Sequence, residues 1–419
     1  MNIFLGIIVG LLVLMFLVTA HECGHFIMAR RNGVRVLEFG ICFPPRAIAW
    51  VKDSKTKKWR RIPRKDWKKP QDGLVFSLNW LPIGGFCQMD GESAADKRDG
   101  TFGKASYWSK TKILFGGVMM NWLIAIIVLT ILAWTGMPEF LDGQFTIESD
   151  TRIVKAPVEI TSVAEDSPAE KAGLKTGDKI LSIDNHDFWR ADDIIQYNKE
   201  HAGQSLVYEI ETTESLDTGI RCIQAPCPSS EERPVTKKTD VTLNSADAEY
   251  LLGVTMASSQ ALSYSTWSAP FVGVGLTAQL TGETFKGVGV MLWNLITGVG
   301  AQFSPDASIR ENGQEAISSV GDSVSGPVGI IGVLFPAFTA AGPANLAFLA
   351  ALISVSLACM NVLPIPALDG GRWLLITIFK LRKKELSKET EEKIVSRAFM
   401  VLLALIFIVT VLDIVRIAR

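Results

Sequence analysis

Three ionisable side chains stand close together at the end of the first apolar stretch of the chain. They are His21, Glu22 and His25, which form the pattern H-E-x-x-H. On a helix, residues four positions apart share one face, so both imidazoles can reach the same metal ion. Zinc suits imidazole ligands, and a catalytic zinc site keeps one coordination position for water. We therefore expect His21 and His25 to bind Zn2+ and Glu22 to act as general base on that water.

The position of this motif argues against a chance match. It follows the uncharged apolar residues 3–20 and precedes the basic pair Arg30 and Arg31. At about 1.5 Å per residue, the motif lies roughly 10–15 Å from that basic edge. Ionisable groups inside a membrane span are costly and usually functional, so a metal site explains them better than chance does.

We expect the third zinc ligand in residues 361–371. Asp369 precedes the next basic edge, at Lys380, by about the distance that separates His21 from its own basic edge. Two prolines and a glycine pair predict a broken helix here, which is tolerated at membrane depth where it is buried in protein or lines a wet cavity. Asp369 is the ligand that we expect. The alternative is that it only caps a final helical segment.

The composition of the chain indicates a membrane protein. Its 419 residues are 48% hydrophobic and 20% charged, with a mean hydropathy of +0.25, whereas soluble domains carry about 25% charged residues. These values exclude a disordered chain, a fibrous chain and a simple soluble enzyme. Four apolar runs are predicted to cross a bilayer core of about 30 Å, namely 3–20, 113–134, 346–363 and 398–412. The first run could instead be a signal peptide, but no basic region precedes it.

The distribution of basic residues predicts how these spans are oriented. Residues 30–69 carry fourteen Lys and Arg against three carboxylates, and residues 380–393 are also basic-rich, so both should be cytoplasmic. Residues 135–265 are acidic and should lie outside, together with both termini. The apolar residues 270–303 must then cross twice or not at all. We favour an interfacial or re-entrant segment because two charges interrupt them.

With these motifs in this order, the chain resembles the site-2 protease family of intramembrane zinc metalloproteases. The resemblance is closest to the bacterial branch typified by the regulator-of-sigma-E protease. It rests on residues 21–25, on residues 361–371 and on the sequence Gly-Pro-Val-Gly-Ile at 326–330, with a weaker element at 81–86. These motifs span nearly the whole chain.

The resemblance implies a zinc metalloendopeptidase that hydrolyses peptide bonds within or near transmembrane helices. Its substrates would be single-span membrane proteins that another protease has trimmed first. Such regulated intramembrane proteolysis releases anti-sigma factors or clears signal-peptide remnants. In this reading, His21, His25 and Asp369 bind zinc and Glu22 activates water.

The family also has a membrane-associated β-hairpin, which residues 76–89 could form here. The edge of such a hairpin could pair with an unwound substrate, although an ordinary cytoplasmic hairpin is the alternative. Substrate contacts are expected at Asn361, Gly84, Gly85, Pro364 and Pro366.

The acidic external region contains a sequence similar to the core signature of PDZ domains, at 167–185. Ser167, Pro168 and Glu170 predict a short capped helix. A strand follows at 179–183, and we expect a peptide-binding groove near 174–183. The sequence shows one such copy, whereas sigma-E-type enzymes carry two.

Two pairs of residues in this external region call for separate interpretations. Cys222 and Cys227 lie in a loop rich in serine, proline and charge, where a disulfide and two free thiols are both allowed. His186 and His201 lie in polar surroundings and are interpreted as surface residues rather than a second metal site.

Together these features predict a polytopic α-helical membrane protein with about four transmembrane helices, a membrane-associated β-hairpin and an extracytoplasmic PDZ-like α/β domain. We expect it in the plasma or inner membrane, with lipid around it, the active site toward the cytoplasmic side and no nucleic-acid partner. The expected segments are 1–30 (first span), 31–110 (basic loop and hairpin), 111–135 (second span), 145–260 (PDZ-like domain), 266–342 (interfacial segment), 343–379 (broken third span), 380–397 (cytoplasmic loop) and 398–417 (fourth span).

Two other functions stay open from the sequence. A catalytically inactive scaffold of the same fold is disfavoured because the full set of site residues is present. A zinc transporter would need carboxylates or histidines along several spans, and the second and fourth spans contain few.

Overall fold

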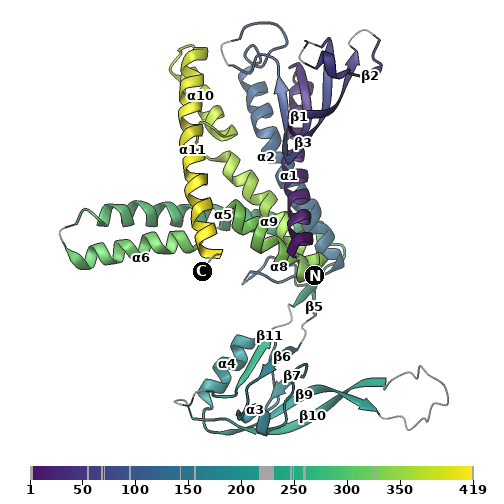
Figure 1. Cartoon of the computed structure of the whole chain (residues 1–419), viewed down its shortest axis with the longest axis vertical. Coiled ribbons are helices and arrows are strands. Elements are labelled where there is room, and N and C mark those ends of the chain that lie inside the picture. Colours follow the sequence, from purple (N-terminus) through teal and green to yellow (C-terminus); the bar gives the residue numbers. More distant parts are fainter. Residues whose placement is uncertain are drawn as a thin grey trace, which may run out of the picture. The chain divides into compact units, whose positions relative to one another are not determined.

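The computed structural model describes residues 3–417 apart from 54–55, 68, 70, 94–95, 142, 155–156, 217–230, 246–247, 249, 258–260, 305 and 324–325. The chain divides into two compact units (Figure 1). The first comprises residues 1–137, 144–150 and 265–419, and the second comprises residues 138–143 and 151–264.

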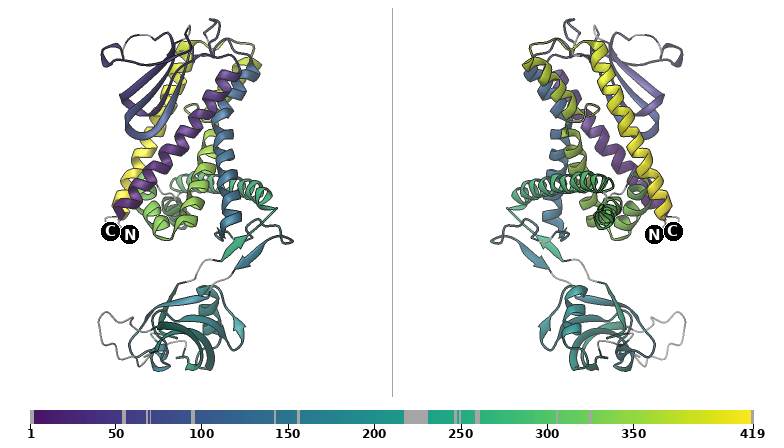
Figure 2. Two further views of the ribbon diagram at one scale, coloured as in Figure 1. Left: turned by 90° about the vertical axis from the view of Figure 1, so that its right-hand side faces the viewer. Right: turned by 90° about the vertical axis from the view of Figure 1, so that its left-hand side faces the viewer.

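Four helices of the first unit are long and apolar enough to cross a membrane. They are α1 (Ile3–Arg31), α2 (Tyr107–Thr135), α9 (Pro343–Val362) and α11 (Lys388–Ile417). The two ends of the chain lie at the same end of this unit (Figure 2), as an even number of crossings requires. The chain therefore has the membrane helices and β-sheets that its sequence predicted.

Helix α11 begins earlier than the expected fourth span. It starts at Lys388, within the segment 380–397 that was expected to be a loop, so that expectation is wrong for its second half. The oxygen Oγ of Ser387 accepts a hydrogen bond from the backbone N–H of Thr390 at 3.2 Å, as an N-cap does. Glu389 and Glu391 follow in the first turn, where carboxylates favour the positive end of the helix.

Helices α1 and α2 approach closely because glycines line their contact. A Cβ on Gly116 would lie 2.7 Å from the carbonyl oxygen of Gly24, and a Cβ on Gly24 would overlap the carbonyl of Gly116. Small residues allow such backbone approach between membrane helices. A larger residue at either position would push the two helices apart.

The predicted break in the third span lies between α9 and α10 (Asp369–Leu381). Residues 363–368 connect the two helices without regular structure. A Cβ on Gly370 or Gly371 would overlap the carbonyl groups of Val362 and Ile365 respectively. The glycine pair therefore lets the start of α10 fold back against this connection.

A three-stranded sheet, in the order β2-β1-β3, lies between the first two spans. Its strands are β1 (Val36–Asp53), β2 (Trp59–Arg61) and β3 (Gly73–Met89), and η1 (Arg64–Asp66) connects the last two. Within β3, residues 75–78 and 85–88 both pair with residues 38–41 of β1, one arm on each side, and the two arms run in opposite directions. The segment 76–89 therefore reverses direction as a hairpin does, but its arms flank β1 instead of pairing directly with each other. Gly84, with φ of +80°, lies in this reversal.

Residues 266–342, which were expected to form an interfacial or re-entrant segment, are helical in most of their length. They contain α5 (Ala269–Ala301), α6 (Ala307–Ser323), α7 (Pro327–Gly329), the π-helical η2 (Ile330–Leu334) and α8 (Phe335–Ala340). Helix α5 packs on α2 and α9, and α6 runs beside it (Figure 1). Neither α5 nor α6 is among the four candidate spans of the described chain.

Asp150 fixes the start of α5. Its carboxylate accepts hydrogen bonds from the backbone N–H and Oγ of Ser268, at 2.9 and 2.6 Å, and from both donors of Thr266. Desolvation opposes ionisation of Asp150, but these hydrogen bonds outweigh it and lower the pKa of its carboxyl group.

Two buried carboxylates attach α11 to the rest of the unit. Among the α11 residues whose side chains are described, only Glu391 and Asp413 are buried. The oxygens of Asp413 accept hydrogen bonds from the backbone N–H groups of Gly326 and Gly329, at 3.1 and 2.8 Å. At the other end, Glu391 accepts a hydrogen bond from Ser93 at 3.1 Å. The motif at 326–330 thus presents N–H groups to a carboxylate inside the last span.

The second unit is built around a sheet in the order β10-β9-β7-β6-β11. The core packs apolar residues of this sheet against α4, and Ile160, Ile180 and Tyr208 are fully buried in it. The elements of the region are β4 (Met137–Pro138), β5 (Arg152–Val154), β6 (Val158–Val163), α3 (Pro168–Lys171), β7 (Lys179–Ile183), β8 (His186–Asp187), α4 (Ala191–Glu200), β9 (Ser205–Leu216), β10 (Glu231–Thr242), β11 (Val254–Ala257) and β12 (Leu262–Tyr264).

The short capped helix and the strand that the sequence of this unit predicted are both present, as α3 and β7. Ser167 Oγ accepts from the backbone N–H of Glu170 at 3.2 Å, which caps α3, and Gly173 ends the turn with φ of +79°. Burial raises the pKa of the Tyr208 hydroxyl, which donates to Asn198 at 2.7 Å. Cys222 and Cys227 lie outside the described residues.

Candidate metal centre

Three potential metal-ligating atoms from two distant parts of the chain converge at one point. His21 Nε2 and His25 Nε2, on α1, lie 3.1 Å apart, and each lies 3.2 Å from Oδ2 of Asp369, the first residue of α10. All three residues are largely buried. Ligands at about 2.0–2.1 Å from a tetrahedral zinc ion are about 3.3 Å from one another, so this triangle has the size of one face of a zinc site.

The hydrogen bonding of His25 also fits a metal ion at this point. Its Nδ1 donates to the carbonyl oxygen of Ile113 at 2.8 Å, so the proton of the neutral ring stays on Nδ1. The Nε2 lone pair then faces a carboxylate oxygen of Asp369, which is another acceptor. Two facing acceptors need a proton or a metal ion between them, and two imidazoles with one carboxylate form a ligand set that zinc accepts.

Asp369 occupies the first position of α10, and Leu368 is the N-cap residue. The alternative in which Asp369 serves only as a helix cap is therefore wrong. Its carboxylate instead faces the ring nitrogens of the two histidines.

Glu22 lies beside the ligand triangle without being part of it. One of its carboxylate oxygens lies within 4.8 Å of the ring nitrogens of His21 and His25. Its side chain also interacts with the backbone of Cys87 in β3. This position leaves the carboxylate close enough to serve a water molecule held at the metal.

Strand β3 passes close to α1 just before the motif. A Cβ on Gly84 would lie 2.7 Å from Cγ1 of Val18, and a Cβ on Gly85 would lie 3.2 Å from Oγ1 of Thr19. The two glycines therefore let β3 reach the helix within three residues of His21.

The other residues that the sequence singled out stand in and after the last turn of α9. Asn361 donates its side-chain amide to the carbonyl oxygen of Leu357 at 2.9 Å, within its own helix. Pro364 and Pro366 lie in the connection to α10, which leads directly to Asp369.

Helix α2 supplies three neighbours that the sequence reading missed. Besides the Ile113 carbonyl, a Cβ on Gly117 would lie 2.6 Å from Nε2 of both His21 and His25, so this position must be glycine. The side chain of Asn121 is fully buried, with its Nδ2 atom 3.3 Å from His21 Nδ1. The sequence did contain signals for these neighbours, namely a glycine pair at 116–117 and an asparagine at 121 inside an apolar span.

One cavity, with a volume of 1120 Å3, is lined by residues that are close along the chain to those of this centre. It is lined by Ala367, two residues before Asp369, by Met89 at the end of β3, and by Glu391 of α11. Its lining carries charges of both signs, from Arg98 and Arg372 to Glu92 and Glu392. Such a lining suits water and polar chain better than lipid.

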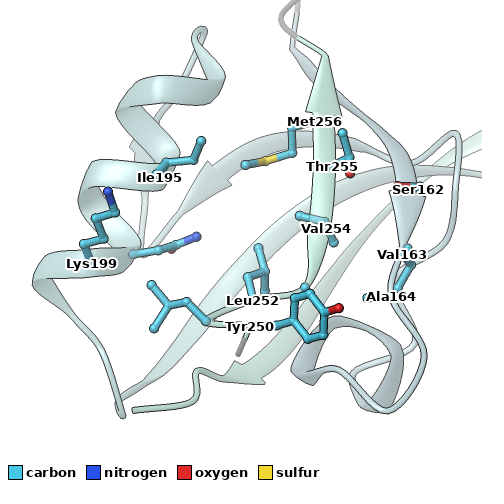
Figure 3. A pocket seen from close by; sticks show the side chains of 13 residues that line it. Ser162, Val163, Ala164, Ile195, Lys199, Tyr250, Leu252, Val254, Thr255 and Met256 are labelled. Atoms are coloured by element: carbon cyan, nitrogen blue, oxygen red, sulfur yellow. The ribbon is translucent and has the colours of Figure 1, made fainter. Parts of the chain in front are cut away.

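The second unit has a groove of 390 Å3 between α4 and β11 (Figure 3). Ile195 and Lys199 line it from α4, and Val254 and Met256 line it from β11. The expectation of a groove near 174–183 is therefore wrong. Strand β7 is hydrogen-bonded on both sides, whereas β11 ends the sheet and can accept a further strand.

The chain is similar to known proteases over almost all of its length. The profile of peptidase family M50 matches residues 9–406. A candidate zinc metalloprotease of Clostridium perfringens is 26% identical over 415 residues, which are 98% of each chain. The zinc metalloprotease Rip1 of Mycobacterium tuberculosis is 25% identical over 387 residues, covering 90% of this chain and 85% of the relative. These names favour a zinc protease over a zinc transporter or an inactive scaffold.

We predict that two single substitutions separate metal binding from proton transfer. Asp369→Ala removes a ligand and should lower the zinc content of purified protein well below one ion per chain. Glu22→Gln should keep stoichiometric zinc but lower peptide cleavage by about a hundredfold or more, since it removes a general base. Elemental analysis and a cleavage assay measure the two effects.

Glu283→Gln is the matched control, because the exposed Glu283 carboxylate pairs with Lys286 on α5 and belongs neither to the ligand triangle nor to the charged cavity. It should keep both zinc and cleavage. Stoichiometric zinc in Asp369→Ala would move the third ligand elsewhere, and near-normal turnover by Glu22→Gln would remove Glu22 from the role of base.

Proposed function

The chain belongs to peptidase family M50 and is a zinc metalloendopeptidase, and we propose that it hydrolyses peptide bonds within or near transmembrane helices of other membrane proteins. One observation carries this proposal. His21, His25 and Asp369 converge on helices α1 and α10, and α1 is long and apolar enough to span a bilayer. A site at that depth meets membrane-embedded peptide bonds.

In the proposed mechanism, His21, His25 and Asp369 would hold a zinc ion, which would supply the positive charge that polarises water and the scissile carbonyl. Glu22 would take a proton from the attacking water and pass it to the leaving amine. The hydrogen bond from His25 Nδ1 to the Ile113 carbonyl keeps the ring oriented while this happens.

Cleavage also requires that the substrate helix unwinds, because helical peptide groups are hydrogen-bonded along the helix. We propose that the unwound segment pairs with β3, which ends its sheet and approaches α1 at Gly84 and Gly85. Asn361, Pro364 and Pro366 would contact the same segment from the connection to α10. The charged cavity beside Ala367 would take its polar flank.

We further propose that the protein is a multi-pass protein of the plasma or inner membrane. The basic residues 30–69 and 380–393 would face the cytoplasm, and both termini and the second unit would face outside. Helix α5 would lie at the outer interface, since Trp293 and Ile296 on it, and Phe303 just after it, are strongly exposed.

Cysteine labelling in intact cells tests this orientation. In a variant whose own cysteines are replaced by serine, a cysteine at Ser215 should react with an impermeant reagent, while cysteines at Lys58 and Lys388 should react only after permeabilisation. Labelling at Lys388 but not at Ser215 would mean that the crossings around residues 270–303 are miscounted.

The second unit is proposed to be a PDZ-like size filter. A site inside the membrane cannot admit a folded domain, so substrates with bulky external parts must be trimmed first, by another protease, or excluded. The groove between α4 and β11 would hold the trimmed end as an added strand. The substrates would accordingly be single-span proteins that have already lost their external domain, as in regulated intramembrane proteolysis.

Purified protein in lipid vesicles, mixed with a single-span substrate in full and trimmed forms, tests both the function and the filter. The intact enzyme should cleave only the trimmed form, and Glu22→Gln should cleave neither. Deletion of residues 151–264, replaced by a short linker, should allow cleavage of the full form as well.

Absence of cleavage of the trimmed substrate by the zinc-loaded enzyme would contradict the proposed function itself. If the deletion leaves the full substrate uncut and also stops cleavage of the trimmed one, the second unit is a docking module or a structural support. The filter proposal would then be wrong.

A further inference from the structure

Asn121 is a polar side chain in the middle of the apolar helix α2, and its environment is unusual. The residue is 0% exposed. Its Nδ2 lies 3.3 Å from Nδ1 of His21, while its Oδ1 is buried without a hydrogen-bond partner among the described residues. An unpaired buried carbonyl oxygen is costly, so this arrangement calls for an explanation.

The chemistry of His21 supplies that explanation. Its Nε2 faces Asp369 and His25, so a neutral His21 that binds a metal through Nε2 carries its proton on Nδ1. The N–H at Nδ1 would then face the NH2 group of Asn121, and two donors would meet. The oxygen and nitrogen of an amide are told apart only by their hydrogen bonds, and a half-turn of the Asn121 amide exchanges them.

We propose that Asn121 is a positioning residue for the metal site, whose Oδ1 accepts a hydrogen bond from Nδ1–H of His21. This bond fixes the tautomer and the ring orientation that direct Nε2 to the metal. It also gives the unpaired oxygen its partner. Partners of this kind, behind metal-ligating histidines, typically change metal affinity about 10–100-fold when removed.

The register of the two helices supports this role. Ile113, Gly117 and Asn121 are spaced four residues apart and therefore share one face of α2, as His21 and His25 share one face of α1. Ile113 serves Nδ1 of His25 through its carbonyl, and Gly117 leaves room for both rings. Asn121 occupies the corresponding place for His21.

The position of Asn121 is also held from its other side. The hydroxyl of Ser354, on α9, donates to the backbone carbonyl of Asn121 at 2.8 Å, and Ser354 is itself 0% exposed. Asn121 is therefore fixed between α1 and α9 and is closed to substrate. Its role can only be exerted through His21.

The inference rests on the proposed zinc site, and its test measures zinc affinity without substrate. The full-length protein in detergent is titrated with a zinc chelator as competitor. Asn121→Leu, which keeps the size but has no acceptor, should weaken zinc binding about 10–100-fold. Asn121→Asp, which keeps an acceptor oxygen, should bind zinc within a fewfold of the unsubstituted protein.

Thr130→Val, a buried polar position elsewhere in α2, is the control and should leave zinc affinity unchanged. Should Asn121→Leu fail to fold, Asn121→Ala replaces it, since the smaller side chain creates no steric conflict, and the same loss is expected. The absorption spectrum of the Co2+-substituted protein should change with Leu or Ala at this position and not with Asp.

Unchanged zinc affinity in Asn121→Leu, or an equal loss in Asn121→Asp, would overturn the proposal. His21→Ala separates this failure from that of the zinc site. If His21→Ala keeps its zinc, the metal site itself is misassigned. If His21→Ala loses its zinc while Asn121→Leu binds zinc with unchanged affinity, only the role of Asn121 is rejected.

Discussion

The close contact between α1 and α2 is the constraint on which the rest of the site depends. Gly24, Gly116 and Gly117 let the two backbones meet where any side chain would collide with a carbonyl or an imidazole. Because the helices are this close, the Ile113 carbonyl reaches His25 Nδ1, and Asn121 reaches His21. Lipid offers no hydrogen bonds, so the polar groups of α1 must find their partners on such a neighbour.

The same requirement explains how the other polar groups of the membrane helices are accommodated. Asp413 in α11 is paired with the free N–H groups of Gly326 and Gly329, and a Cβ on Gly326 would lie 2.6 Å from that carboxylate. Ser354 is paired with the backbone of Asn121. Glycines at close contacts and carboxylates at helix starts thus hold the spans in register, and that register brings Asp369 to the histidines.

The sequence predicted the parts of this account that depend on residue type and local spacing. The H-E-x-x-H motif, the broken helix before Asp369 and the four apolar runs could be read directly, as could the capped turn at Ser167. The partner of β3 could not, because β1 lies more than twenty residues earlier and pairing depends on tertiary contacts. The groove of the second unit was misplaced for a related reason, since only the strand order shows that β11, and not β7, is at the edge. Asn121 was missed because its proposed role depends on a contact with His21, which is one hundred residues away along the chain.

The central claim is that two histidines and one carboxylate, brought together from α1 and α10, form the zinc site. X-ray absorption at the zinc edge of the purified full-length protein tests it most directly. The account predicts a shell of nitrogen and oxygen at about 2.0–2.2 Å with the outer scattering of two imidazoles. A sulfur shell at about 2.3 Å, which would bring Cys23 into the site, or the scattering of a single imidazole would contradict it.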